Sequence, residues 1–190
     1  SVNHTLQEDA ADIVSQVAEA CNAKGVPHPD IVTESGRALT AHHSVLIFNV
    51  LNKNGDMDLW TLSMSGDRTP RVFVSSKQNE LNGTFSPDGR WVAYQSYASG
   101  RYEIVVRPFP DKDPARTISR DGGRYPRWRG DGKELFFVPA PAQFRMVRVT
   151  TKPSFSVTQP VAVPRPFGIS GPATPRMFDL LPDGRIIGVG

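Results

Sequence analysis

Residues able to hold a charged ligand lie directly after a short run rich in β-branched side chains. Glu34, Gly36 and Arg37 follow Ile31 to Thr33. In an α/β barrel, residues just beyond the C-terminal end of a strand point into the active site. A carboxylate and a guanidinium in that position could bind opposite charges of a ligand. The alternative is a solvated loop in which Glu34 and Arg37 only pair with each other.

The histidines and the cysteine give weaker chemical signals. His42 and His43 are adjacent, so in a strand their side chains would point to opposite faces. No acidic residues stand near them at ligand spacing, and we therefore predict no metal site. Cys21 is the single cysteine, which excludes an internal disulfide and a cysteine-rich zinc site. No catalytic residue is predicted.

The first elements expected along the chain are a helix and a short strand. Thr5 and Glu8 have the spacing of a capping box, and Gly25 and Pro27 are typical of a helix end. Between them, apolar residues at helical spacing predict one buried stripe: Leu6, Ala10, Ile13, Val14, Val17 and Cys21. A strand over Ile31 to Thr33 would complete a βα unit.

From about residue 45 the pattern changes to short strands joined by repeated turns. Three turns share the order proline or glycine, Asp-Gly, cation and apolar strand, and their aspartates are Asp88, Asp131 and Asp183. The spacings of 43 and 52 residues, with several strands per period, favour β-propeller blades over a β-sandwich. Recurrence in the same hairpin predicts that the aspartates form turns, rather than acting in acid–base or calcium chemistry.

Aromatic and basic residues of this part are also expected to be structural. The three tryptophans are predicted to pack between blades rather than to form a binding platform: Trp60, Trp91 and Trp128. The basic run is interpreted as solvated rims rather than a nucleic-acid surface: Arg124, Arg127, Arg129 and Lys133. The proline-rich stretch 157–169 is expected to be an irregular connection.

Composition divides the chain near residue 51. The 190 residues carry a net charge of +3, but residues 1–51 carry −4 and the remainder +7. Only one of the 17 aromatic residues, Phe48, precedes the boundary. We predict two regions of separate origin, 1–51 and 52–190, with the first strand beginning near 45. The alternative is one domain with a helical and a β-rich part. No apolar run has the length of a membrane span.

Residues 45–190 resemble the bacterial WD-repeat-like propeller family of Tol type (TolB-like), which also occurs C-terminal to bacterial serine/threonine kinases. The phrases that carry the resemblance are FSPDGRWVAYQS, SGRYEIVVRPFP, DGGRYPRWRGDGKELFF and LPDGR. It implies a mainly β fold with about three blades, the last incomplete. It also implies an interaction or sensor module whose partner is a protein or the remaining propeller blades. Kinase signatures are missing, so kinase activity is not implied.

Residues 1–51 resemble a fragment of biosynthetic arginine decarboxylase, a pyridoxal-phosphate enzyme of polyamine biosynthesis with an alanine-racemase-like barrel. The phrases TLQE and GVPHPDIVTESGRALTAHHSVLIFNVL carry this match. The resemblance implies that Glu34 lies against the pyridine nitrogen, Arg37 pairs with the cofactor phosphate, and Gly36 lets the backbone approach that phosphate. The cofactor needs a Schiff-base lysine, yet Lys24 is the only lysine of this region.

Together these observations predict a mainly β chain: a partial propeller with an N-terminal helix–strand appendage derived from a β/α barrel. We expect a non-catalytic interaction or sensor module that is part of a larger bacterial protein, without a bound cofactor and without nucleic acid as partner. The alternative is a decarboxylase fragment that is inactive alone and whose parent uses pyridoxal phosphate. The decarboxylase resemblance favours a cytoplasmic location, whereas the propeller family is often extracytoplasmic.

Overall fold

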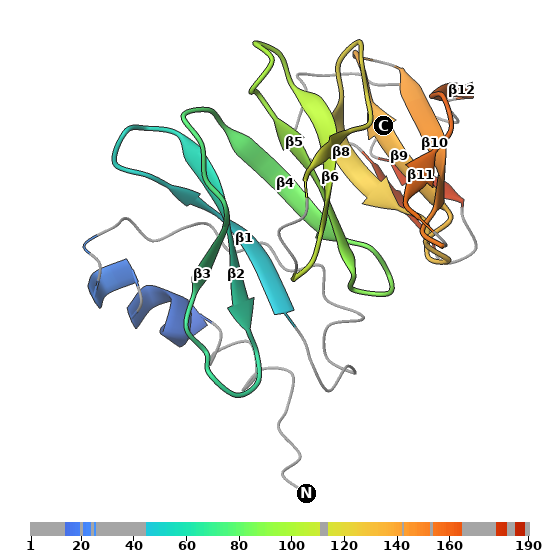
Figure 1. Cartoon of the computed structure of the whole chain (residues 1–190). Helices are drawn as coiled ribbons and strands as arrows, with labels where there is room; N and C mark the ends of the chain where they lie inside the picture. The colour runs from blue at the N-terminus through green and yellow to red at the C-terminus, as the bar shows by residue number, and fades with distance from the viewer. Residues whose placement is uncertain are drawn as a thin grey trace, which may run out of the picture. The chain divides into compact units, whose positions relative to one another are not determined.

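The chain is mainly β, as predicted (Figure 1). The computed structural model describes residues 14–19, 21–23, 25, 45–110, 114–141, 143–152, 154–164, 178–181 and 185–188. The chain forms two compact units, Ser1–Ser76 and Lys77–Gly190.

The first unit contains a three-stranded antiparallel sheet in the order β1-β2-β3. Its strands are β1 (Val45–Leu51), β2 (Met57–Ser63) and β3 (Arg71–Val74). The β1–β2 hairpin closes because Gly55 reaches a φ of 87° and the side-chain oxygen of Asn52 accepts the amides of Asn54 and Asp56. Leu51, where the composition changes, is the last residue of β1.

A helix over residues 14–19 and 21–23 packs on this sheet. Val17 and Cys21 are buried with Leu62 of β2, as the predicted stripe requires. The prediction for Val14 was wrong, since that side chain is 54% exposed. At about 100° per residue, Val14 lies only about 20° around the helix from Cys21, but two turns before it along the axis. Val14 is the first described residue of the helix and lies beyond the contact that Val17 and Cys21 make with Leu62. The remaining stripe residues lie outside the described part of the chain.

The second unit contains two larger antiparallel sheets. One has the order β4-β5-β6-β7, and its strands are β4 (Glu80–Phe85), β5 (Trp91–Ser96), β6 (Glu103–Pro108) and β7 (Arg116–Thr117). The other has the order β8-β9-β10, with two short strands on β10: β8 (Arg124–Trp128), β9 (Glu134–Val138), β10 (Phe144–Thr150), β11 (Ser156–Val157) and β12 (Val161–Val163). A hairpin of β13 (Phe178–Leu180) and β14 (Ile186–Gly188) follows.

The stretch 157–169, expected to be irregular, contributes to the second large sheet. β11 pairs with the end of β10, and β12 pairs with its beginning, so that Val161 stands opposite Met146 and Val163 opposite Phe144. For Val157 and Val161–Val163 the expectation was wrong, because prolines prevent helix and central strand but permit an edge strand. Residues 165–169 lie outside the described part of the chain. Pro160 and Pro164 flank β12 without interrupting its pairing.

The second large sheet has apolar side chains on both faces. Along β9, Leu135 and Phe137 join the cluster formed with the preceding sheet, whereas Phe136 and Val138 join the cluster formed with Phe178 of β13. Strand residues alternate between faces, so adjacent side chains can serve two separate interfaces. The first of these clusters comprises Ala93, Ile104, Val106, Ile118, Trp128, Leu135, Phe137, Val147 and Val149. Sheets stacked face to face in chain order are the arrangement of propeller blades.

The first strands of the two large sheets, β4 and β8, carry an irregularity at equivalent positions. Asn82 and Tyr125 each have a φ of 54°, and the register shifts beside both of them. They are 43 residues apart, the spacing of the Asp88 and Asp131 turns. The buried Gln95 accepts a hydrogen bond from the Asn82 side chain at 2.9 Å and from the Tyr125 amide at 3.1 Å. One glutamine therefore joins the bulges of two neighbouring sheets.

Three short outer strands are preceded by a proline. Pro70 stands directly before β3, Pro114 two residues before β7, and Pro160 directly before β12. Proline lacks the amide proton that a further strand would need, and it is one of the devices that blunt sheet edges. These prolines therefore make the outer edges of the sheets less suited to pairing with a strand of another molecule.

The alternation along β9 predicts where the second unit is most sensitive to mutation. Phe137 is 1% exposed, and truncation to alanine leaves a cavity between two sheets. Phe137→Ala should lower the free energy of unfolding by about 3–5 kcal/mol, measured by urea denaturation. Ile187→Ala is the control, because Ile187 is 47% exposed and should change this value by less than about 0.5 kcal/mol. Equal losses in both variants would contradict the assigned core.

Candidate functional site

The residues that the decarboxylase resemblance assigned to a cofactor site are not among those that the structure describes. Glu34, Gly36 and Arg37 lie outside the described residues, as do His42 and His43. Among the residues that the structure describes, no group of three or more His, Cys, Asp or Glu side chains could hold a metal ion. No helix in this described part is long and apolar enough to cross a membrane.

The aspartates of the repeated turns do form turns. Asp88 accepts hydrogen bonds from the Ser86 hydroxyl at 2.6 Å and the Arg90 amide at 3.1 Å, and Asp131 accepts the Lys133 amide at 2.9 Å. The following glycines have φ values of 70° and 71°, which only glycine adopts without strain. Asp183 lies outside the described residues. The turn-forming prediction therefore holds for both aspartates that can be placed.

Two of the tryptophans link the sheets of the second unit, as expected. Trp128 is buried, and its indole nitrogen donates to the carbonyl of Thr84 in the preceding sheet at 3.3 Å. Trp91 stacks on Phe155 of the following sheet with ring centroids 4.3 Å apart. The third, Trp60, is half-buried in β2 of the first unit.

The basic run does not form one surface. The Arg127 side chain is 13% exposed and its Nε lies 3.7 Å from Asp179, so the prediction of a solvated rim was wrong for this residue. Arg129 pairs with Glu134 at 2.9 Å. Arg124 instead lies over the ring of Tyr102, 4.7 Å from its centroid.

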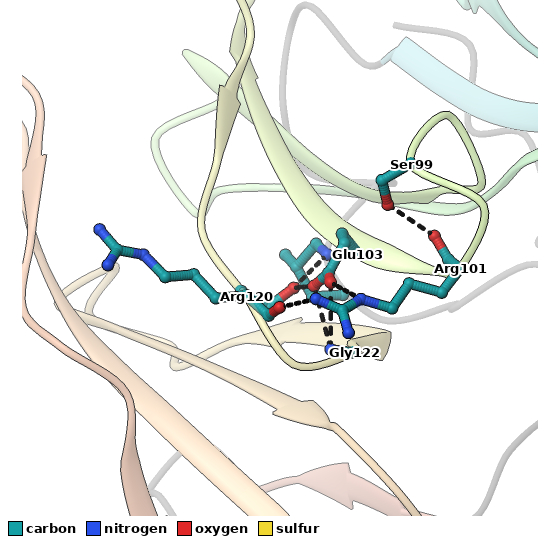
Figure 2. Close-up of polar contacts among 7 residues, drawn as sticks. Ser99, Arg101, Glu103, Arg120 and Gly122 are labelled. Atoms are coloured by element: carbon teal, nitrogen blue, oxygen red, sulfur yellow. Dashed lines mark hydrogen bonds and ion pairs between the residues drawn. The ribbon is translucent and has the colours of Figure 1, made fainter.

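A buried carboxylate of the second unit forms a polar cluster with several hydrogen-bond partners (Figure 2). Glu103, at the start of β6, is 5% exposed. It accepts hydrogen bonds from the Ser119 hydroxyl, from the Gly122 amide at 3.1 and 3.2 Å, and from Arg101 Nε at 2.6 Å. We call these four residues the Glu103 cluster. A buried charge is tolerated when it is paired and hydrogen-bonded in this way.

Further contacts fix the segment around the Glu103 cluster. Arg101 also donates to the Arg120 carbonyl, and the Ile104 amide donates to the Ser119 hydroxyl at 2.8 Å. A side chain at Gly123 would meet Ile104 Cγ1 at 2.6 Å and Ser119 Oγ at 2.7 Å, so only glycine permits this approach. The residues after β7 are thereby held against the start of β6.

The cluster forms one wall of an open depression of about 390 Å³. It is lined by Ser99, Gly100, Arg101, Glu103, Thr117, Ser119 and Arg120. Figure 2 shows the Arg120 side chain pointing away from Glu103, so its guanidinium adds no bond to the cluster. Arg101 is therefore held within the Glu103 cluster, whereas the side chain of Arg120 is exposed.

An aromatic pair lies at the same hairpin. Tyr97 and Tyr102 flank the turn that supplies Ser99 to Arg101, and their rings meet edge to face with centroids 5.0 Å apart. Arg124 lies over the Tyr102 ring. The hairpin therefore combines ordered aromatic rings, guanidinium groups and hydroxyl groups at one end of the sheet.

The polar groups of the Glu103 cluster are occupied by one another. The Ser119 hydroxyl donates to Glu103 and accepts from Ile104, so it is not poised as a nucleophile. None of the described residues is a histidine that could act as its base. No role was predicted for Glu103 from the sequence. Its partners Ser119 and Gly122 lie 16 and 19 residues further along the chain, too far for a local pattern to reveal.

Comparison with known proteins finds decarboxylases for a short segment. No protein-family model matches the chain. It is 59% identical over 51 residues to the biosynthetic arginine decarboxylase of Phocaeicola vulgatus, covering 27% of this chain and 8% of that protein. The enzyme from Deinococcus radiodurans is 60% identical over 55 residues, covering 29% and 8%. The resemblance to arginine decarboxylase is confirmed. The chain spans about a tenth of the length of these curated relatives.

Similar solved structures are more distant. A protein assigned as TolB from Agrobacterium tumefaciens has a TM-score of 0.48 and 15% identity, covering 60% of this chain and 44% of that one. A puromycin-hydrolysing peptidase from Mycobacterium tuberculosis has a TM-score of 0.46 and 19% identity, covering 63% and 22%.

The Glu103 cluster predicts a strong dependence on one charge. Glu103→Gln keeps the shape but weakens the bonds from Ser119, Gly122 and Arg101. It should lower the free energy of unfolding by about 1.5–3 kcal/mol in urea denaturation, because hydrogen bonds to a charged group are lost. The control is Glu134→Gln, which breaks the more exposed pair with Arg129 and should cost less than about 1 kcal/mol. A smaller loss at Glu103 than at Glu134 would contradict the cluster's role.

The turn at Asp88 predicts a defined pH dependence. Burial raises the pKa of the Asp88 carboxyl, but hydrogen bonds from Ser86 and Arg90 outweigh it and hold the pKa below 3.8. The resulting stabilisation is complete above the unfolded pKa and is lost as pH falls through the folded value. Asp88→Asn should therefore be less stable than the wild type at pH 7, and the difference should shrink below pH 3.8.

Thermal unfolding across the acid range measures this difference. Ser86→Ala serves as a companion variant, because it removes one donor and should reproduce part of the loss. A stability difference that stays constant from neutral to acidic pH would mean that Asp88 acts through its shape and not through its charge.

Proposed function

We propose that this chain is a non-catalytic interaction module built from propeller-type blades. The observation that carries the proposal is the combination of rigid stacked sheets with an ordered, polar hairpin end. Leu135 and Phe137 join two of the sheets, and the Glu103 cluster orders the depression at residues 99–101. A scaffold of this kind places binding groups on loops while its core supplies only rigidity. The proposed partner is a protein or the remaining blades of a propeller.

The second candidate is a fragment of a pyridoxal-phosphate-dependent arginine decarboxylase, inactive alone. The 59% identity over 51 residues favours this origin for the N-terminal region. In that reading Glu34, Gly36 and Arg37 are the vestige of a cofactor site. The cofactor would act as an electron sink during carbon dioxide release in the parent enzyme. Residues 1–51 and 52–190 would then be of separate origin, joined within β1.

The described residues do not fit cofactor chemistry in this chain. β1 pairs antiparallel with β2, whereas a β/α barrel encloses its cofactor with parallel strands. The helix before it packs on this antiparallel sheet through Val17 and Cys21. Lys24, the only lysine of residues 1–51, directly follows helical residues 21–23. We therefore derive no reaction through pyridoxal phosphate.

An assay of arginine decarboxylation discriminates the two candidates. The full chain, incubated with pyridoxal phosphate and arginine, should release no carbon dioxide above a heat-denatured sample. Titration with pyridoxal phosphate should give no saturable change in visible absorbance, and Arg37→Gln should behave like the wild type. Release of carbon dioxide that requires the cofactor would overturn the non-catalytic proposal. Saturable binding that is lost in Arg37→Gln would restore the cofactor site.

A further inference from the structure

We propose that the hairpin end at Tyr97–Tyr102 docks an acidic segment of a partner protein. Arg124, Arg120 and the ring of Tyr102 form the contact surface. This inference rests on the proposed interaction function and adds the chemistry of the partner.

The side chain of Arg124 is held over the Tyr102 ring in a position from which it could bind an anion. Its guanidinium lies 4.7 Å from the centroid of Tyr102, and Tyr97 supports that ring from its edge. Stacking occupies one face of the guanidinium plane and leaves the N–H groups at its rim available. The Arg124 guanidinium makes no hydrogen bond or ion pair with any residue that the structure describes. A carboxylate could take these donors in a bidentate bond without first ordering the side chain.

The neighbouring charges favour the same ligand. Glu103 is buried and paired with Arg101, so its charge is largely neutralised. Arg120 is exposed at the depression and makes no side-chain bond within the described residues. The exposed Asp121 lowers the local charge but leaves it positive. Residues 77–190 contain 17 Lys and Arg against 10 Asp and Glu, a net charge of +7 that would attract an acidic partner.

The shape of the site favours a peptide over other anions. Pockets for small molecules bury most of the ligand surface, whereas this depression is open. Single-stranded nucleic acid needs aromatic faces on which bases can stack. Here Arg124 covers a face of Tyr102, and the ring of Tyr97 stands edge to face against it. Aspartate or glutamate side chains along an extended segment can reach Arg124 and the depression without displacing these contacts.

The experiment measures binding of a fluorescein-labelled oligo-aspartate peptide to the full chain by fluorescence anisotropy at low salt. Arg124→Gln should weaken binding about tenfold, because a charge-assisted contact is removed. The matched control is Arg148→Gln. Arg148 is also an exposed strand arginine of the second unit, but it lies in β10, where it stands opposite Glu134 of β9 in the backbone register. Its replacement should change affinity less than about twofold.

A second pair of variants separates stacking from general charge. Tyr102→Leu keeps all arginines but removes the ring under Arg124, and should weaken binding about threefold. Tyr102→Phe keeps the ring and should bind like the wild type. Equal losses in Arg124→Gln and Arg148→Gln would overturn the proposal, since the attraction would then be unspecific.

Tighter binding of oligo-thymidylate than of the peptide, sensitive to Arg124→Gln, would also overturn it in favour of nucleic acid. These outcomes are independent of the decarboxylation assay. A chain that releases no carbon dioxide and does not bind the peptide through Arg124 would retain the interaction function but lose this surface.

Discussion

The structure of the second unit depends on one strand with two apolar faces. On β9, Leu135 and Phe137 pack toward one neighbouring sheet, while Phe136 and Val138 pack toward the hairpin of β13 and β14. An antiparallel sheet with one solvated face would alternate apolar and polar residues, and this strand does not. The sheet that contains β9 therefore needs a packing partner on each face to bury its apolar side chains. Its faces are occupied by that packing, so binding groups are confined to the ends of the strands.

Polar contacts fix how the stacked sheets are aligned. Apolar packing is non-directional, so it sets the proximity of two sheets more firmly than their alignment. Gln95 joins Asn82 of its own sheet to the backbone of Tyr125 in the next, where both residues have positive φ. Buried hydrogen bonds of this kind are costly when misaligned, because each unpaired group loses its hydration. The equivalent bulges are thus held in one relative position.

Local patterns predicted the fold better than the site. The Asp-Gly turns at Asp88 and Asp131 were readable because a tight turn depends on adjacent residues. Val14 was misplaced because helical spacing indicates a stripe but not how far along the helix axis the contact extends. β12 was missed because proline argues against strands in general, although it is tolerated at an edge. The contact of Arg124 with Tyr102 was not predictable, since it joins the starts of strands in two different sheets.

The apolar run of β1 explains how one segment can suit two structural contexts. Leu46 and Phe48 pack toward the cluster of Val17, Cys21 and Leu62. Alternating side chains in an extended segment need only an apolar surface on one side and a strand partner beside it. The backbone bonds are the same in kind whether the neighbouring strand runs parallel or antiparallel. A segment whose sequence resembles part of a decarboxylase can therefore serve as the first strand of an antiparallel sheet. What such a segment does not retain is the cofactor site, because that site requires residues from several strands of a closed barrel.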